Sequence, residues 1–282
     1  MFYKIIKGIV KKNFILESNM QFNFGQNWKE FSAKALSGEK IDEARKDFAA
    51  LLELDISGKS FLDIGFGQGM SLLLATERSA ETFGCDINPI CKEVLQHNQL
   101  NYFSHLKSKE IPVVVGSILE DDVLTEIKSM SISGEFDIVH SWGVLHHTGD
   151  MTKAIENASS LVKENGILVL AIYNKHWSSK MWLFIKWFYC KSPKFLQQLL
   201  IFLFYPIIWL AKFLVTGKNP KKQQRGMDFF YNIIDWVGGY PYEYETIEAT
   251  KIRMEQLGFD CLKTIPAEVP TGCNEFVFRK MI

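Results

Sequence analysis

The sequence has no excess of charge of either sign. Its 282 residues include 32 Lys and Arg and 32 Asp and Glu, so the formal net charge at pH 7 is zero. Proteins whose main partner is a nucleic acid usually carry a basic surplus or a concentrated basic stripe. The charge balance therefore argues against a nucleic-acid partner, although a basic stripe assembled by folding would reopen that alternative.

Cysteine is scarce, and none of the five cysteines forms a C-x-x-C pair. An odd number of cysteines, mostly within apolar segments, is typical of a reduced chain with neither a disulfide framework nor a zinc site. The first residues, MFYKIIKGIVKKNF, interleave lysine with apolar residues, and no small-residue cleavage site follows, which argues against a secretory signal. We therefore expect a cytoplasmic protein without a bound metal.

Internal repeats are also absent, and short apolar segments alternate with segments of helical periodicity. This alternation predicts an α/β fold in which helices cover both faces of a parallel sheet. One helix is expected to begin at Asn88, with Pro89 in its first position, and another to close at Asn165-Gly166. The expected strands are 58–65, 81–87, 111–117, 136–142 and 167–174, and then two closing strands, 259–266 and 274–280.

The stretch DIGFGQG, from Asp63 to Gly69, follows the first expected strand and precedes a helix. Glycines let the backbone approach a ligand closely, and the N-terminus of the helix points amide groups at it. Asp86 ends the second strand, where a carboxylate can accept hydrogen bonds from both hydroxyls of a ribose. These features predict a site for a nucleotide-containing cofactor; the alternative is a tight turn beside a surface aspartate.

These segments resemble the motifs of class I S-adenosylmethionine-dependent methyltransferases, from about Phe24 to the C-terminus. The similar stretches are FLDIGFGQG, FGCDI, VVVGSI, FDIVHSWGVLHHTG and NGILVLAIYN. More narrowly, FGQNW and the tail GGYPYEYETIEATKIRMEQLGF…GCNEFVFRK are similar to bacterial small-molecule methyltransferases related to the ubiquinone O-methyltransferases. The resemblance implies a Rossmann-like, seven-stranded, mostly parallel sheet, a helical cap insertion between the fifth strand and an antiparallel C-terminal hairpin, and S-adenosyl-L-methionine as cofactor.

The resemblance also suggests which residues contact the cofactor. Such enzymes often place an acid after the third strand to bind adenine, whereas this chain has Ser117 there, so recognition would depend on the backbone around Ser117 and Ile118. Trp28 would close over the cofactor or pack in the core. The candidate cofactor contacts are Asp63, Gly65, Gly67, Gly69, Asp86, Ile87, Ser117, Ile118, Ser141 and Trp28.

Methyl transfer from a sulfonium requires an aligned nucleophile, and an oxygen nucleophile benefits from a base. His146 and His147 follow the fourth strand, near the point where the strand order reverses and ligands gather, and histidine titrates near neutrality. Either is a candidate base; alternatively, one of them packs or caps the next helix, in which Asp150 is expected in the N-terminal turn. The candidate acceptor contacts are Tyr173, Asn174, Tyr240 and Tyr242.

The segment 180–225 is unusually apolar, and Phe195 to Ala211 carries no charge. As a helix this run would span about 25 Å, short of a hydrocarbon core of about 30 Å, and Pro206 is expected to break it. One predicted basic, solvent-facing arc comprises Lys180, Lys186, Lys191 and Lys194, and a second basic cluster comprises Lys218, Lys221, Lys222 and Arg225. The pattern leaves three alternatives: a packed or dimerising lid, a helix lying at the inner face of the membrane, or a true membrane span.

We divide the chain into four parts. These are N-terminal helices over the cofactor site (1–58), a cofactor-binding core (59–175), a hydrophobic helical cap (176–235), and a C-terminal helix with antiparallel strands (236–282). The leading function is methylation of a small hydrophobic or phenolic acceptor, with O-methylation favoured. The alternatives are a methyltransferase for a macromolecule such as tRNA or protein, and a non-catalytic cofactor-binding subunit whose apolar segment is a partner interface.

Overall fold

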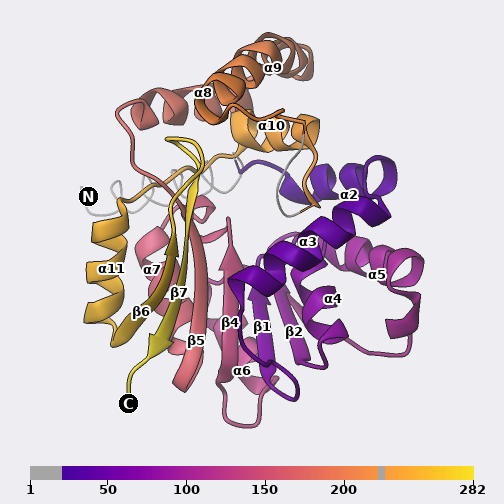
Figure 1. Cartoon of the computed structure of the whole chain (residues 1–282), viewed down its shortest axis with the longest axis vertical. Helices are drawn as coiled ribbons and strands as arrows, with labels where there is room; N and C mark the ends of the chain where they lie inside the picture. Colours follow the sequence, from indigo (N-terminus) through magenta and orange to yellow (C-terminus); the bar gives the residue numbers. More distant parts are fainter. Residues whose placement is uncertain (1–20, 222–225) are drawn as a thin grey trace, which may run out of the picture.

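The computed structural model describes residues 21–221 and 226–282, which contain a sheet with helices on both faces (Figure 1). The expectations for the first residues, and for Lys222 and Arg225, lie outside the described residues. The strands are β1 (Ser60–Ile64), β2 (Glu81–Asp86), β3 (Val113–Val115), β4 (Phe136–Trp142), β5 (Val162–Tyr173), β6 (Phe259–Ile265) and β7 (Cys273–Lys280). Their order in the sheet is β3-β2-β1-β4-β5-β7-β6, so the strand order reverses between β1 and β4. β1 to β5 pair in parallel and β7 is antiparallel to both neighbours, which confirms the predicted fold class.

Side chains that alternate along each strand build one core on either face of the sheet. Phe61 joins the core beneath α3, α4 and α5, whereas Leu62 joins the core beneath α6, α7 and α11. The helices around the sheet are α2 (Phe24–Lys34), α3 (Gly38–Leu51), α4 (Met70–Glu77), α5 (Ile90–Tyr102), α6 (Asp121–Ser129), α7 (Met151–Ser160) and α11 (Ile247–Gln256). A strand that is buried at every position, as β1 is, is typical of a parallel sheet.

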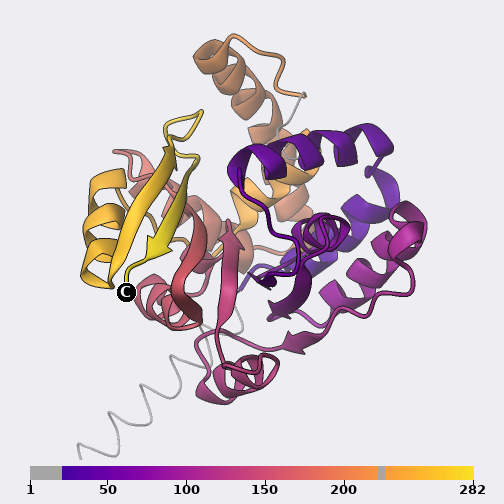
Figure 2. The same cartoon turned by 60° about the horizontal axis from the view of Figure 1, so that its bottom comes forward.

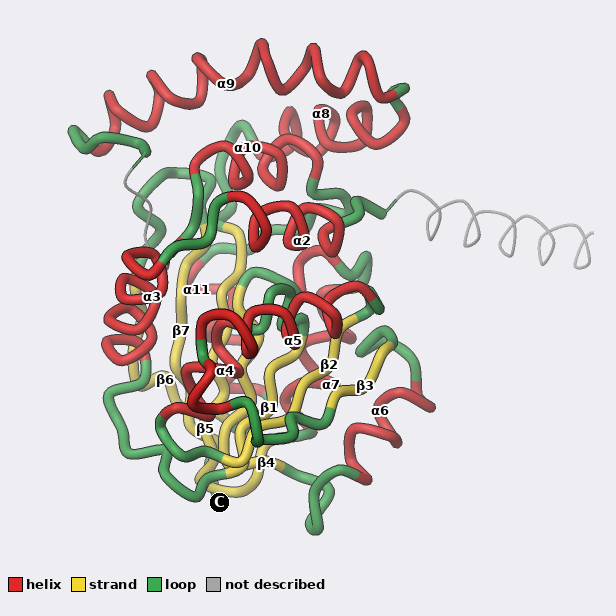
Figure 3. The backbone as a smooth tube through the Cα atoms, turned by 90° about the vertical axis from the view of Figure 1, so that its right-hand side faces the viewer, coloured by secondary structure: helices red, strands yellow, loops and turns green. Residues whose placement is uncertain are grey.

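Three further helices form the cap between β5 and the C-terminal hairpin. They are α8 (Ser179–Lys191), α9 (Lys194–Thr216) and α10 (Phe229–Gly238). These helices share a small core of their own, centred on Tyr189, Ile201 and Ile233. α9 lies farthest from the sheet, beyond α8 and α10 (Figures 1 and 3), and Figure 2 shows it reaching past the other helices. The helical cap is thus confirmed, while the four-part division of the chain stays a prediction.

The predicted helix ends are partly right. Asp150 accepts a hydrogen bond from the backbone of Lys153 (3.0 Å), which confirms its place at the start of α7. Asn88 likewise accepts a bond from the backbone of Ile90 (3.1 Å), but α5 begins at Ile90, one residue later than expected. Asn165-Gly166 does not close α7, however, because the helix ends at Ser160 and β5 begins two residues later.

The expected break at Pro206 was also wrong, since α9 runs through this residue. A proline within a helix removes one backbone hydrogen bond. Half-buried apolar side chains on both sides of Pro206, among them Tyr205 and Ile208, pack into the cap core, and this packing compensates for the lost bond.

Candidate active site

The turn after β1 adopts a backbone conformation that requires glycine. Gly65 and Gly67 have φ angles of +73° and +54°, in the left-handed region that other residues rarely adopt. A Cβ atom on Gly67 would lie 2.8 Å from Nε1 of Trp28, and one on Gly65 would lie 2.3 Å from Val144. Trp28 therefore stands directly over the turn, in the position expected of a residue that closes a cofactor site.

Asp86 lies beside this turn, at the carboxyl end of β2. One carboxylate oxygen accepts a hydrogen bond from the amide of Gly67 (2.9 Å), and the other accepts one from the amide of Asn88 (2.8 Å). Burial raises the pKa of Asp86, although both amides oppose the shift. Each oxygen has a second lone pair, so the fixed carboxylate can still accept two ribose hydroxyls.

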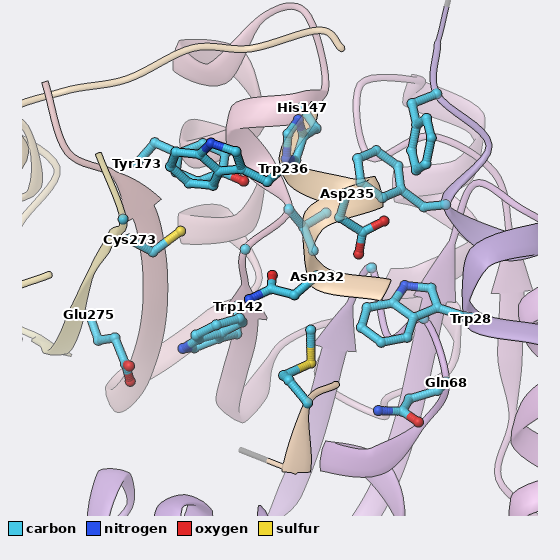
Figure 4. Close-up of a pocket in the computed structure, with 18 of the residues that line it drawn as sticks. Trp28, Gln68, Trp142, His147, Tyr173, Asn232, Asp235, Trp236, Cys273 and Glu275 are labelled. Atoms are coloured by element: carbon cyan, nitrogen blue, oxygen red, sulfur yellow. The ribbon is translucent and has the colours of Figure 1, made fainter. Parts of the chain in front are cut away.

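A cavity of about 680 Å³ adjoins the turn and continues beneath the cap (Figure 4). Its volume is within the range of about 300–1,000 Å³ that small-molecule sites occupy. Eight of the ten candidate cofactor contacts line it: Trp28, Asp63, Gly65, Gly67, Asp86, Ile87, Ser117 and Ile118. Gly69 and Ser141 are not among its lining residues. Ser141 is buried and donates a hydrogen bond to the carbonyl of Ile64 (3.0 Å), so it joins β4 to β1.

Asp63 has a buried partner that the sequence analysis missed. Its Oδ1 lies 2.7 Å from Nδ1 of His140, and both side chains are almost fully buried. His140 is the β4 residue that pairs with Asp63 in the parallel register, so the contact follows from the sheet order. This pair holds the first acid of the glycine motif in one orientation.

The two adjacent histidines have different surroundings. His147 lines the cavity, and its Nδ1 lies 2.6 Å from the carbonyl of Pro241, to which it donates. Burial and the nearby ammonium of Lys186 lower the pKa of His147 to about 3, so it is neutral at pH 7 with Nε2 as its acceptor. His146 is fully buried against Tyr173 and is not among the lining residues. Of the two, the geometry favours His147 for contact with a bound molecule.

Asp235, on α10, is the main cavity residue that the sequence analysis did not identify. Its carboxylate lies between His147 and Trp28 (Figure 4), and its Oδ1 accepts a hydrogen bond from Asn27 (2.7 Å). Part of its surface faces the cavity and protein buries the rest, and this burial raises the pKa of Asp235 to about 7. A signal was present: in the helix FFYNIIDWVG, Asn232 and Asp235 are polar residues three positions apart in an otherwise apolar segment.

Lys186 corrects one of the sequence predictions. The basic arc on α8 was expected to face solvent, and Lys180, Lys191 and Lys194 are exposed, but Lys186 is 0% exposed. Its Nζ donates to the carbonyl of Trp236 and lies about 5 Å from three aromatic ring centroids, those of Tyr173, Trp236 and Tyr242. Burial lowers the pKa of Lys186 to about 7. The three rings and the carbonyl compensate for the buried ammonium.

The four candidate acceptor contacts also differ in position. Tyr173 lines the cavity and packs edge-on against Trp236, with ring centroids 5.4 Å apart. Tyr242 is buried behind Tyr173, and the centroids of the two rings are 5.0 Å apart. Asn174 donates to the carbonyl of Pro270 (2.8 Å), so it anchors the loop between β6 and β7. Asn174, Tyr240 and Tyr242 are not among the lining residues, so Tyr173 alone of the four is placed for direct contact.

A parallel sheet with an antiparallel last strand, a glycine turn after β1 and an acid at the end of β2 together define a class I methyltransferase. The family model described as Methyltransferase domain matches residues 37–199, more than half of the chain, and the chain belongs to this family. Its fold is that of the S-adenosylmethionine-dependent methyltransferases.

Individual relatives are more distant. The chain is 27% identical over 124 residues to the ubiquinone biosynthesis O-methyltransferase of Rhodopseudomonas palustris, and the matched region covers 44% of each protein. It is 25% identical over 161 residues to that of Chromobacterium violaceum, which covers 57% of this chain and 64% of the relative. The chain thus spans about half the length of the curated relatives it matches.

Solved structures share the fold at low sequence identity. Magnesium protoporphyrin IX methyltransferase from Synechocystis, with bound SAH, gives a TM-score of 0.54 at 12% identity and covers 95% of this chain and 99% of that one. An O-methyltransferase family protein from Burkholderia thailandensis gives 0.50 at 11% identity, covering 86% of this chain and 57% of that one.

The residues of this chain fit the cofactor. The turn brings backbone amides to the cavity without Cβ atoms, Asp86 presents two fixed acceptors, and Trp28 covers the turn. Gln68, next to Gly67, also lines the cavity.

Proposed function

We propose that the protein methylates a hydroxyl oxygen on a small, hydrophobic, aromatic acceptor. The observation that carries this proposal is the position of Asp235, whose carboxylate faces the cavity among the aromatic side chains of Trp28, Tyr173 and Trp236 (Figure 4). Aromatic walls suit a flat apolar acceptor, and a carboxylate suits a hydroxyl that must lose its proton. The similarity to ubiquinone O-methyltransferases supports the same chemistry.

In this proposal the cofactor supplies a methyl group already activated by its sulfonium. Asp86 and the glycine turn hold the cofactor, and Trp28 excludes water from above. Asp235 accepts the acceptor's hydroxyl proton on its carboxylate, while Asn27 keeps that carboxylate aimed at the cavity. A pKa of about 7 suits this step, because a base is most effective when its pKa lies near the working pH. Nε2 of His147 accepts a hydrogen bond from a second hydroxyl of the molecule that is methylated.

The cavity favours a small acceptor over tRNA or a folded protein, because the candidate base projects from the cap into the cavity and not onto an open face. We also propose a cytoplasmic location, which the five free cysteines support. The test is to incubate the purified protein with S-adenosylmethionine and a panel of phenols, catechols, amines and thiols of matched size, with mass spectrometry of the products. O-methylation of phenols or catechols is expected; transfer to amines or thiols alone would contradict the proposal.

A further inference from the structure

The outward face of α9 is apolar along its whole length. Among the exposed side chains, Phe195 (72%), Phe202 (75%) and Leu214 (72%) are the most accessible, and the same face carries Leu199, Leu203, Ile207, Leu210 and Phe213. The opposite face packs on α8 and α10 through residues such as Ile201. A helix that is apolar all round is normally buried or in contact with lipid. Only 6% of the most apolar window of α9 is buried, so this face needs a partner.

The charged side chains in the stretch of sequence around this face are all basic. No Asp or Glu occurs from residue 165 to residue 227, a stretch with ten Lys and Arg in a chain whose net charge is zero. Lys191 and Lys194 are exposed where α8 meets α9, and Lys218 and Lys221 are exposed just beyond the other end of α9. Among the described residues, one acid forms an ion pair with any of these four exposed lysines: Glu268 lies 2.8 Å from Lys218. The apolar face therefore lies between two groups of cations.

α8, the helix before α9 in the cap, has an exposed apolar face of its own. Met181, Phe184 and Phe188 on this helix and Trp177 (84% exposed) just before it are exposed and recur at helical spacing, with Lys180 beside them. Aromatic and aliphatic side chains next to lysines match the interfacial region of a bilayer, where rings sit at the level of the headgroups and ammonium groups meet lipid phosphates.

We propose that the outer face of α8 and α9 is a docking surface for an anionic lipid bilayer, on which α9 lies parallel to the membrane plane. With 23 residues, α9 is about 34 Å long and apolar enough to cross a bilayer by length and composition. A crossing helix would have to give up the packing of Ile201 and Ile233 in the cap core and the place of Ile208 in the cavity wall. Lying flat keeps these contacts and buries only the exposed face.

Docking would also place the mouth of the cavity at the lipid. Ala211 and Val215, on α9, line the cavity and are exposed at the surface, so the cavity opens beside the proposed docking face. If the proposed function holds, an apolar acceptor dissolved in the bilayer can enter the site without crossing water. This last consequence depends on the proposed function; the docking itself does not.

Flotation of the full-length protein with vesicles tests the docking without any turnover. We expect the protein to float with vesicles of phosphatidylcholine mixed with phosphatidylglycerol, to bind pure phosphatidylcholine more weakly, and to lose binding as salt screens the charges over about 10 Å at 0.1 M. Absence from the floating fraction with both vesicle types would overturn the proposal. Asp235→Asn should float normally, which separates docking from catalysis.

Paired variants identify the surface. Lys191→Glu with Lys194→Glu should weaken binding at least twentyfold, because each cation near an anionic surface contributes about fivefold. The exposed pair Lys46→Glu with Lys92→Glu makes the same change in net charge elsewhere and should have little effect. Phe202→Ser with Leu214→Ser should weaken binding roughly tenfold or more, whereas Leu100→Ser with Ile252→Ser, also exposed, should not. Equal effects of test and control pairs would overturn the assignment.

Three further results would each replace lipid with another explanation. Resistance of the vesicle-bound protein to alkaline carbonate extraction would indicate a membrane span. A concentration-dependent dimer in light scattering, abolished by Phe202→Ser with Leu214→Ser, would indicate a second copy of the chain. Retardation of a tRNA mixture that Lys191→Glu with Lys194→Glu abolishes would indicate a nucleic-acid partner. We expect a vesicle-bound protein that carbonate releases, a monomer in solution and no tRNA retardation.

Discussion

Asn27 on α2 donates hydrogen bonds from one amide nitrogen to the carboxylate of Asp235 (2.7 Å) and to the carbonyl of Tyr231 (3.2 Å), both on α10. The donor and the carboxylate are 208 residues apart in the chain. This contact ties α2 to the cap, so the helix that places Trp28 over the glycine turn also orients the proposed base.

Asp235→Asn should lower turnover by about 10²–10⁴-fold while leaving cofactor affinity intact, because the amide cannot accept the hydroxyl proton. In the unmodified enzyme, burial raises the pKa of Asp235 from 3.8 to about 7. Since the base must be ionised, activity should rise with pH through about 7 and then level off. The rate-against-pH profile measures this, and an unchanged rising limb in the Asn variant would exclude Asp235 as the base.

Asn27→Ala should move the rising limb of that profile to higher pH. The hydrogen bond from Asn27 favours the ionised carboxylate, so its loss raises the pKa of Asp235 further. Gln26→Ala, a change at the exposed neighbouring position of the same helix, is the matched control and should leave the midpoint in place. A lower turnover with no shift of the midpoint would indicate that Asn27 has only a structural role.

Asp86→Ala should weaken cofactor affinity at least tenfold. A hydrogen bond to a charged group is worth about 1.5–3 kcal/mol, and the carboxylate is placed to accept two from a ribose. Isothermal titration calorimetry with S-adenosylmethionine measures the change, and the exposed Asp260→Ala serves as control. Equal affinities in the two variants would remove the ribose role.

Gly67→Ala should reduce cofactor binding far more than Gly58→Ala does. Both glycines have positive φ angles, +54° and +69°, so both changes cost about 1–2 kcal/mol of backbone strain. Only at Gly67 does the new Cβ meet a neighbour, Trp28, whereas nothing lies within 4 Å at Gly58. Thermal unfolding should show similar losses of stability for the two variants. Titration calorimetry with S-adenosylmethionine should show weaker binding for Gly67→Ala than for Gly58→Ala. Similar affinities would mean that Trp28 moves aside freely.

His147→Ala should lower kcat/KM for the acceptor by about tenfold or more, since His147 lines the cavity and its pKa of about 3 keeps Nε2 unprotonated. His146→Ala should act mainly on stability, lowering the free energy of unfolding by about 1–3 kcal/mol, because it removes a fully buried ring packed on Tyr173. Denaturant unfolding and steady-state kinetics on both variants test this. The reverse pattern would return His146 to the role of candidate base.

Local features of the chain determined the cofactor half of the site. The glycine turn and Asp86 are recognisable because strand ends, positive-φ positions and capping residues depend on neighbours only a few residues away. For the same reason the sequence predicts all seven strands, although β5 begins at Val162, before the expected residue 167. The apolar character of residues 195–211 is likewise plain from the sequence.

Only the tertiary structure decided the acceptor half. Asp235 becomes a candidate base because α2, α8 and α10 enclose it, which raises its pKa, and no local pattern encodes that burial. Lys186 was assigned to a solvent-facing arc, yet the aromatic rings of Tyr173, Trp236 and Tyr242, from two other segments of the chain, surround its ammonium. Helical periodicity places a side chain on a face of its helix, but which face is covered depends on elements that are distant in sequence. Long-range packing therefore decided which polar residues face the cavity, which stay in water and which are buried.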